Sequence, residues 1–432
     1  MADSKEDIQS GKYKLHKLVL TNYNSEQVDI SFLVNDFSVR ETLSSLFLVY
    51  EFTIVDGVNL LERYLITGNE KLKLIILKKD TPDSDFVQLE TDLVVTGIKN
   101  YSRPSNEAQV YKFTAISEAA FASSIKKISS SVSGVMTSII SELFTDISRE
   151  QLTVLDDTAE GNFKIVLPNY SYADTFKLLL SKAQKVNGSP FYLFETLFHG
   201  NILSSYEEMV GRDSFDTYKQ RSHDNTKAFS DDNFDINRTR IRSIDSNIGM
   251  SHFEVMNTGG YFSRTHALDY SKKEYRYNDY SIFDEDLPKI DKDIILDKEF
   301  EISGTNISDY NNAKQFYISE NSLAFGSGID NLNNRFENSV PKKAMVVNNQ
   351  TAITHNITVD GDTRLRVGTC INIDLPPAAD PEALPEIGTD DLLSGKFLIS
   401  SIVHNFDKDG GYSQRVSLRK DSIDFNMIEG KY

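Results

Sequence analysis

The sequence carries one β-hairpin pattern twice, once near each end of the chain. The first copy is residues 93–101 (LVVTGIKNY), followed after a polar loop by residues 109–114 (QVYKFT). The second copy is residues 397–406 (FLISSIVHNF), followed after a Gly-rich turn by residues 414–419 (QRVSLR). Internal repetition constrains architecture more strongly than any local pattern, because both copies are expected to form the same structural unit.

Setting Ile98 on Ile402 aligns the two hairpins. A stretch upstream of each hairpin also matches, residues 68–74 (GNEKLKL) against residues 361–367 (GDTRLRV). Two copies of one β-module predict a structural protein built around a pseudo-symmetric axis. The alternative is that the likeness is generic, since all β-hairpins share alternating apolar residues and a polar turn.

The composition describes a folded protein without covalent cross-links. At 432 residues the chain is long enough for about two to four domains. Hydrophobic residues make up 39% of it, which excludes a wholly disordered chain. A single cysteine, Cys370, excludes an intrachain disulfide and any multi-cysteine metal site, and fits folding in a reducing cytoplasm.

Neither a secretory signal nor a membrane span is expected. The first seven residues are polar and acidic, whereas a signal peptide needs an apolar core segment. The longest apolar runs, such as residues 46–50 and 74–77, are far shorter than the roughly 20 residues that cross a bilayer. The sequence therefore predicts a soluble protein that makes no contact with a membrane.

The charge balance is strongly acidic, with 46 basic and 64 acidic residues and a net charge of −18. Such a field repels phosphate backbones, so specific nucleic-acid binding is not expected. The acidity could instead line a path along which DNA must not adhere. The alternative is that it only aids solubility.

Residues 13–117 predict a first antiparallel β-barrel. Short runs of branched and aromatic residues, such as residues 49–54 (VYEFTI), alternate with Asn, Asp and Gly turns. A closed barrel is expected because closure removes unpaired strand edges.

Residues 118–206 predict an α+β domain with two amphipathic helices. Ser171 followed by Asp174 resembles a capping box at the start of the second helix, and Asn187-Gly188 is expected to stop it. A hairpin of residues 191–197 and 202–206 follows. The first helix is predicted from apolar residues at spacings of three and four, namely Val132, Val135, Met136, Ile139, Ile140, Leu143 and Phe144.

A second β-barrel is predicted to be split between residues 207–272 and 344–425. Within the first part, residues 253–256 and 261–262 are expected to be strands around the turn at residues 259–260. The tract 273–343 is interpreted as an insertion or extended contact segment, and a mobile loop is the alternative. The predicted fold class is thus mainly β, with two similar antiparallel barrels and an α+β insertion.

No catalytic, cofactor-binding or metal-binding residues are assigned, and no cofactor is expected. Phosphate-loop, zinc-protease and serine-hydrolase motifs are absent from the sequence, and the seven histidines lack metal-ligand spacing. Residues 360–362 and 407–411 match only fragments of calcium loops. Cys370 is interpreted as a small buried apolar residue. A carboxylate pair for glycoside hydrolysis is left open, although the chain has no Trp for sugar stacking.

With this order of domains, the chain resembles baseplate hub proteins of contractile-tailed bacteriophages. It is also similar to the N-terminal half of type VI secretion spike proteins. The resemblance covers residues 15–206 and 344–422, and it is most suggestive over residues 360–376 (DGDTRLRVGTCINIDLP) and 392–404 (LLSGKFLISSIVH). The tract 207–343 matches less clearly.

The resemblance implies a non-enzymatic virion protein assembled in the host cytoplasm. It implies a homotrimer whose two barrels per chain adapt a six-fold tail tube to a three-fold central spike, with baseplate wedge proteins as further partners and a lumen through which DNA passes. Two alternatives stay open. One is a hub or spike component of another contractile injection system. The other is a virion-associated carbohydrate-binding or glycan-degrading all-β protein.

Overall fold

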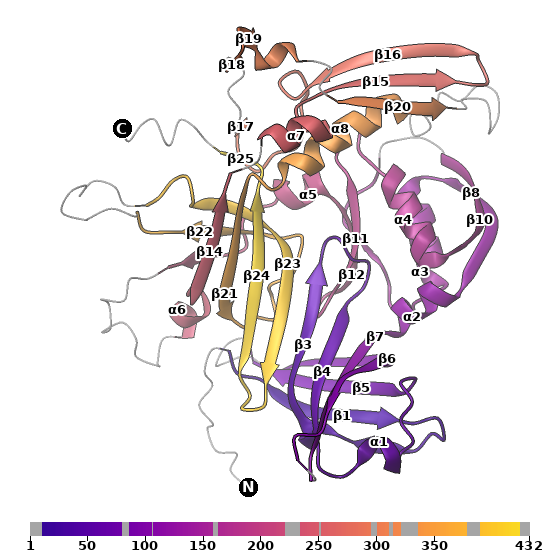
Figure 1. Cartoon of the computed structure of the whole chain (residues 1–432), viewed down its shortest axis with the longest axis vertical. Helices are drawn as coiled ribbons and strands as arrows, with labels where there is room; N and C mark the ends of the chain where they lie inside the picture. Colours follow the sequence, from indigo (N-terminus) through magenta and orange to yellow (C-terminus); the bar gives the residue numbers. More distant parts are fainter. Residues whose placement is uncertain are drawn as a thin grey trace.

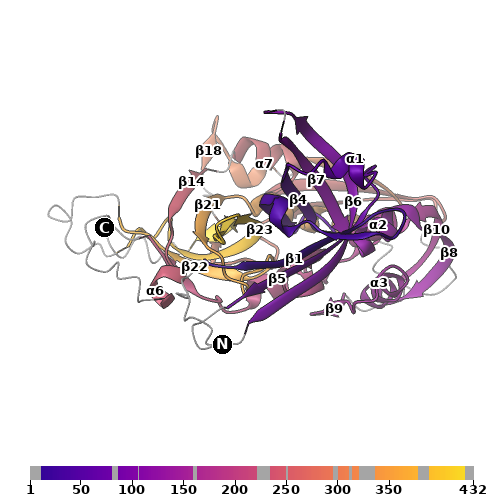
Figure 2. The same cartoon turned by 90° about the horizontal axis from the view of Figure 1, so that it is seen from below.

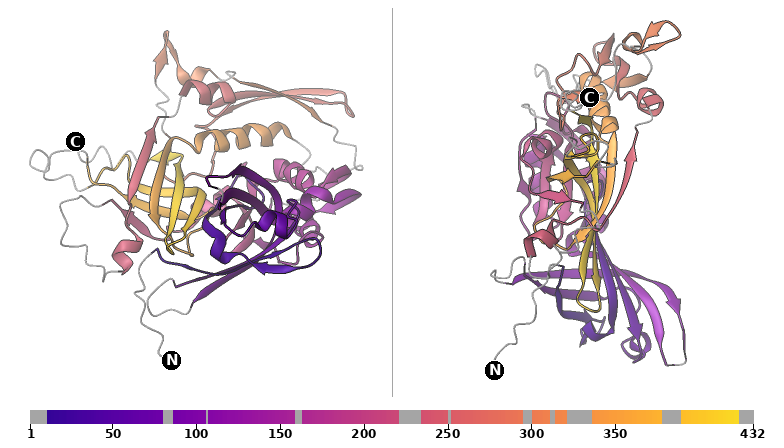
Figure 3. Two further views of the ribbon diagram at one scale, coloured as in Figure 1. Left: turned by 60° about the horizontal axis from the view of Figure 1, so that its bottom comes forward. Right: turned by 90° about the vertical axis from the view of Figure 1, so that its left-hand side faces the viewer.

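The computed structural model describes residues 11–79, 86–105, 107–158, 163–220, 234–249, 252–294, 300–310, 314–320, 336–377 and 389–423. They form a mainly β structure dominated by one 13-stranded sheet, as the sequence predicted (Figure 1). The strands of the N-terminal unit lie beside the C-terminal ones, the helices of residues 118–182 lie on one side, and residues 252–349 cover one end (Figures 2 and 3).

The N-terminal unit is a curled antiparallel sheet in the order β3-β4-β7-β6-β5-β1-β2. Side chains alternate between buried and exposed along its strands, as half-buried strands require. The buried side chains form one core that includes Phe52, Leu74 and Phe113. The elements are β1 (Lys14–Thr21), β2 (Gln27–Asp29), a 3₁₀ helix (Ser31–Leu33), β3 (Val34–Thr42), β4 (Val49–Asp56), α1 (Leu60–Arg63), β5 (Lys71–Lys78), β6 (Val87–Ser102) and β7 (Gln109–Ser117).

The α+β unit has its own core, built on helices α3 and α4. The predicted cap is confirmed, because the Ser171 hydroxyl accepts a hydrogen bond from the backbone N–H of Asp174 at 3.1 Å. The elements are α2 (Glu118–Ile125), β8 (Lys127–Gly134), α3 (Met136–Thr145), β9 (Thr153–Val154), β10 (Phe163–Ser171), α4 (Tyr172–Lys182), β11 (Phe191–Thr196), β12 (Gly200–Ser205) and α5 (Tyr206–Gly211).

The first predicted helix begins later than the sequence pattern indicated. Val132 lies in strand β8 and pairs with Ile165, and Val135 is the extended residue that precedes α3. Gly134 separates strand from helix with φ of 146°, a conformation that favours glycine. The helix α4 likewise ends at Lys182, before the predicted stop at Asn187-Gly188.

The C-terminal unit shares the large sheet with the N-terminal unit. Strand β3 pairs antiparallel with β23, from Thr42 opposite Ser401 to Asp36 opposite Asp407. The described ladder therefore runs continuously through both predicted barrels. The elements are β13 (Thr217–Lys219), α6 (Phe234–Arg238), β14 (Ser243–Ile248), β21 (Ile353–Asp360), β22 (Cys370–Asp374), β23 (Gly395–Asp407), β24 (Tyr412–Lys420) and β25 (Ser422–Ile423).

The described residues between 252 and 349 form a layer with a three-stranded sheet in the order β16-β15-β20 packed against α8, and their buried side chains share one core with the C-terminal unit. Residues 253–256, predicted as a strand, lie in helix α7, where Val255 is buried against the neighbouring Gly260. The elements are α7 (His252–Thr258), β15 (Phe262–Asp269), β16 (Glu274–Ser281), β17 (Asp293–Ile294), β18 (Glu301–Ile302), β19 (Thr305–Asn306), a 3₁₀ helix (Ile307–Asp309), β20 (Gln315–Glu320) and α8 (Phe336–Asn349).

The two units repeat one strand order. In the N-terminal unit six neighbouring strands run β3-β4-β7-β6-β5-β1, and in the C-terminal unit six run β14-β21-β24-β23-β22-β13. The hairpins also share a β-bulge, between Val95 and Gly97 in β6 and between Ile399 and Ser401 in β23. These bulges coincide when Ile98 is set on Ile402, so topology and sequence indicate the same alignment. One difference is that β22 pairs parallel with β13, whereas β5 pairs antiparallel with β1.

The upstream part of the predicted repeat is corrected by the strand pairing. Leu72 of β5 pairs with β6, and the corresponding neighbour of β23 is Ile371 of β22. The repeat of residues 68–74 therefore falls on β22 and not on residues 361–367. The latter form turns, in which the side chain of Asp362 accepts a hydrogen bond from the backbone N–H of Arg364 at 3.0 Å.

Candidate assembly surface and buried junctions

Three buried carboxylates join the structural units. Glu41 of β3 is only 1% exposed. Its two oxygens accept hydrogen bonds from the backbone N–H groups of Leu197, at 3.1 Å, and Val367, at 2.7 Å. One of those oxygens also lies 3.2 Å from Nε2 of His404. Because these partners come from the α+β and C-terminal units, Glu41 fixes three parts of the chain at one point.

The second carboxylate, Glu195 of β11, joins the α+β unit to the N-terminal sheet. It accepts hydrogen bonds from the backbone N–H of Leu48 at 3.0 Å and from the Ser117 hydroxyl at 3.1 Å. Burial raises the pKa of Glu195 from 4.5 to about 7. Both donors are distant from Glu195 in sequence and belong to the N-terminal sheet and its connecting loop, so the carboxylate connects the two units.

Asp421, the third carboxylate, ties the C-terminal strand to the layer of residues 252–349. It accepts hydrogen bonds from the Tyr206 hydroxyl at 2.6 Å and from the backbone N–H of Ile290 at 3.0 Å. Burial raises the pKa of Asp421. The three carboxylates together indicate a rigid frame, because each is held by hydrogen bonds from segments distant in sequence.

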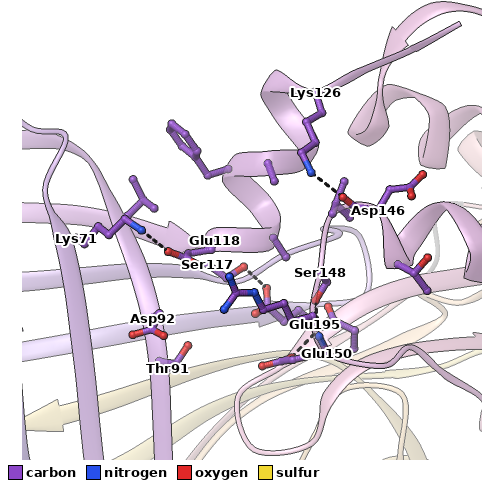
Figure 4. Close-up of a pocket in the computed structure, with 18 of the residues that line it drawn as sticks. Lys71, Thr91, Asp92, Ser117, Glu118, Lys126, Asp146, Ser148, Glu150 and Glu195 are labelled. Carbon is purple, nitrogen blue, oxygen red and sulfur yellow. Dashed lines mark hydrogen bonds and ion pairs between the residues drawn. The ribbon is translucent and has the colours of Figure 1, made fainter.

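A polar cleft of about 720 Å³ lies between strands β5 and β6, helix α2 and the loop after α3 (Figure 4). Two of its lysine side chains have partners within the cleft. Lys71 forms a 2.8 Å ion pair with Glu118, and the ammonium of Lys126 donates to the backbone carbonyl of Asp146 at 2.7 Å. Glu195, which is buried, also lines the cleft. The cleft thus lies between the N-terminal and α+β units, which the Lys71–Glu118 ion pair and the hydrogen bonds of Glu195 already connect.

The exposed face of the three-stranded sheet is aromatic. The ring of Tyr317 stacks on His266 with centroids 4.8 Å apart, and Tyr317 is 76% exposed. Tyr275 and Tyr277 of β16 lie on the same face, each more than half exposed. Arg264 lies over the Tyr277 ring at 5.2 Å. Large exposed aromatic side chains are enriched at protein–protein contacts. No pattern in the sequence indicates this surface.

Cys370 is 1% exposed, which confirms its interpretation as a buried apolar residue. Across the described ranges, no cluster of three or more His, Cys, Asp or Glu side chains could hold a metal ion. The described helices are also too short or too polar to cross a bilayer.

Comparison with solved structures identifies the fold. The tail protein of Neisseria meningitidis MC58 superposes with a TM-score of 0.52 at 12% identity, covering 95% of this chain and 97% of that one. The 43 kDa tail protein of prophage MuSo2 from Shewanella oneidensis matches at 10% identity and a TM-score of 0.48, over 94% and 98% of the two chains. A type VI secretion component from Escherichia coli matches at 10% identity and a TM-score of 0.42, over 94% and 76%.

No protein-family model matches the chain, and no curated protein matches it by sequence. The Neisseria superposition, which spans nearly the whole of both chains, shows that this chain has the fold of a tail protein. The resemblance identified from the sequence is therefore confirmed at the level of the fold.

Proposed function

We propose that this chain is the structural hub of a bacteriophage tail baseplate. Three copies form a ring that adapts the six-fold tail tube to a three-fold central spike. The observation that carries the proposal is the strand order repeated in the two units of one chain. The tail-protein fold supports it.

Duplication within the chain has a direct geometric use. Three chains with two similar units each provide six near-equivalent positions around a ring. Head-to-tail contacts close such a ring only when the rotation between successive units is correct, so the two units must keep matching shapes. The repeated sheets would face the six-fold tail tube.

The parts that occur only once per chain would match the three-fold symmetry of the spike. The α+β unit and the layer of residues 252–349 would each appear three times in the ring. They are suited to three-fold contacts with the spike and to wedge proteins at the periphery. The exposed aromatic face around Tyr275, Tyr277 and Tyr317 is one such surface.

The charge agrees with a passive role toward DNA. Three chains would carry 3 × −18, or −54, before any counterions bind. A strongly negative lumen repels phosphate groups, so DNA would pass without specific binding. The domain boundaries predicted from the sequence belong to the same proposal, as do a virion location and the absence of enzymatic activity.

Native mass spectrometry of the purified chain, alone and with its spike and tube proteins, tests this function. The expected species has three times the chain mass of 48.8 kDa. Electron microscopy of the assembled particle should then show six-fold features toward the tube and three-fold features toward the spike. A chain that stays monomeric with both partners, or that hydrolyses glycans, would contradict the proposal.

A further inference from the structure

Within one chain, the two units are joined by the pairing of β3 with β23. The repeat predicts an equivalent pairing at a second place, where the described part of the chain supplies no partner strand. Strand β23 has β24 along one edge, and its other edge is shared by β22 and then β3. Strand β6, its equivalent in the repeat, has β7 along one edge and β5 along the first part of the other. From Thr96 onward the position equivalent to β3 has no strand in the part of the chain that the structure describes.

The complementary edge is also open. Strand β14 is the equivalent of β3, since each lies at the end of its set of six strands. One edge of β3 pairs with β4 and the other with β23, whereas β14 pairs only with β21 among the described strands. Figure 1 shows β14 at the outer edge of the sheet. Unpaired edges present rows of free N–H and C=O groups, which are templates for another strand.

We propose that β14 of one chain pairs antiparallel with the second half of β6 of a neighbouring copy, repeating between chains the β3–β23 joint within each chain. The occupant is a second copy because β14 and β6 lie seven strand steps apart in the sheet order, roughly 30 Å along the sheet. The inference rests on the proposed ring and specifies its interface.

The register follows from the equivalences. Phe113 of β7 corresponds to Val416 of β24, because each lies opposite the matched isoleucines. Their neighbours Phe52 and Ile357 then correspond, and so do Phe37 and Ile244.

Arg40 lies three residues after Phe37 in β3, and Asn247 lies three residues after Ile244 in β14, so Asn247 is the equivalent of Arg40. Arg40 pairs with Val403, whose equivalent in β6 is Lys99. Asn247 should therefore lie opposite Lys99 of the neighbouring chain.

The side chains at these edges are compatible with the pairing. Lys99 carries positive charge on the β6 side, and Asp245 carries negative charge on the β14 side. In the proposed register Asp245 lies diagonal to Lys99, a distance at which opposite charges attract across strands. Beyond Lys99, strand β6 has a second bulge, between Lys99 and Ser102, that β23 lacks, so the equivalence of the two strands extends only to Lys99.

Disulfide trapping with the full chain tests the register. Asn247→Cys combined with Lys99→Cys places two thiols on exposed positions, so the fold should be unaffected. Paired strands hold opposite Cα atoms about 5 Å apart, within the range that a disulfide spans. Mild oxidation should convert the chain to a covalent trimer on a non-reducing gel. The native Cys370 should stay reduced, because burial raises its pKa to about 12.

The matched control combines Asn247→Cys with Lys112→Cys. Lys112 pairs with Lys99 on the next strand, so it lies about 5 Å farther from the proposed joint. At that separation a disulfide does not form, so covalent trimer should be at least about ten-fold lower than with Lys99→Cys.

The native mass of the same samples distinguishes the proposed trimeric ring from the proposed pairing of β14 with β6. A trimer that cross-links only through Lys99→Cys supports the joint. A trimer without that cross-link, or with equal cross-linking in the control, overturns the joint and leaves the ring. A monomer without cross-links, with or without the tube and spike proteins, overturns both.

Discussion

Glu41 and His404, 363 residues apart in sequence, meet 3.2 Å apart inside the joint between the two repeated units. Glu41 is 1% exposed and His404 is fully buried. The same carboxylate holds backbone N–H groups of the α+β and C-terminal units. The contact therefore fixes the relative position of the two units in one chain, which is what a ring of alternating units requires.

Removing this carboxylate should destabilise the protein strongly. Glu41→Ala leaves two buried backbone N–H groups without their acceptor, and each unsatisfied donor costs about 1–3 kcal/mol. The expected loss in the free energy of unfolding is about 3 kcal/mol or more, measured by urea denaturation. Arg40→Ala, on the exposed neighbouring position, should change it by less than about 0.5 kcal/mol. Equal effects of the two substitutions would count against the role of Glu41.

The core of the α+β unit should respond to truncation of helix α3. Ile139 is 3% exposed and packs in the core of this unit. Ile139→Ala should lower the free energy of unfolding by about 2–5 kcal/mol, since it removes buried methyl groups and leaves a cavity. Glu142→Ala on the exposed side of the same helix is the control. A loss below about half a kcal/mol for Ile139→Ala would mean that this face is not packed.

Glu195 should make stability fall as pH rises from about 4.5 to 7. In this window the folded protein retains a proton that the unfolded chain has released, because burial raises the carboxyl pKa to about 7. The total change is up to about 3 kcal/mol, at about 1.4 kcal/mol per pKa unit.

The variant Glu195→Gln removes this proton equilibrium. Its free energy of unfolding, measured by denaturation at several pH values, should fall less across the window than that of the wild type. Parallel pH profiles for the two proteins would show that Glu195 titrates normally in the fold.

Gly361 should not tolerate a side chain. An added Cβ would overlap Cδ1 of Tyr412, a buried ring that stacks on Phe406 with centroids 4.3 Å apart. Gly361→Ala should therefore lower the free energy of unfolding by about 1–3 kcal/mol through overpacking. At Gly211 an added Cβ meets no described atom within 4 Å. Gly211→Ala should be near neutral in the same thermal or chemical denaturation, and similar losses in both variants would contradict the packing argument.

Sequence patterns predicted the elements whose signals are local. The Ser171 cap and the hairpin of β11 and β12 depend on neighbouring residues, and both are present. The spacing of Val132 and Val135 predicts a helix, but Val132 pairs with β10 instead, and the glycine at position 134 separates this strand from the helix. Residues 253–256 show the opposite error, since packing against α8 favours a helix there.

The joint between units was beyond the reach of sequence patterns. The pairing of Thr42 with Ser401 is made by backbone groups, which every residue carries, so the sequence contains no specific signal for it. Glu41 and His404 look like ordinary strand residues until the fold brings them together. The hairpin repeat was detectable because it extends over many residues, and the shared bulge gives it a structural basis.

The pairing of β3 with β23 also constrains how the protein is made. At about 5–20 residues per second, the 363 residues between Glu41 and His404 take about 20–70 seconds to translate. During that time the free side of β3 is exposed on the nascent chain, where it can pair wrongly with other polypeptides. Slow synthesis or high expression should therefore favour aggregation, and chaperones that shield β3 on the ribosome should improve the yield.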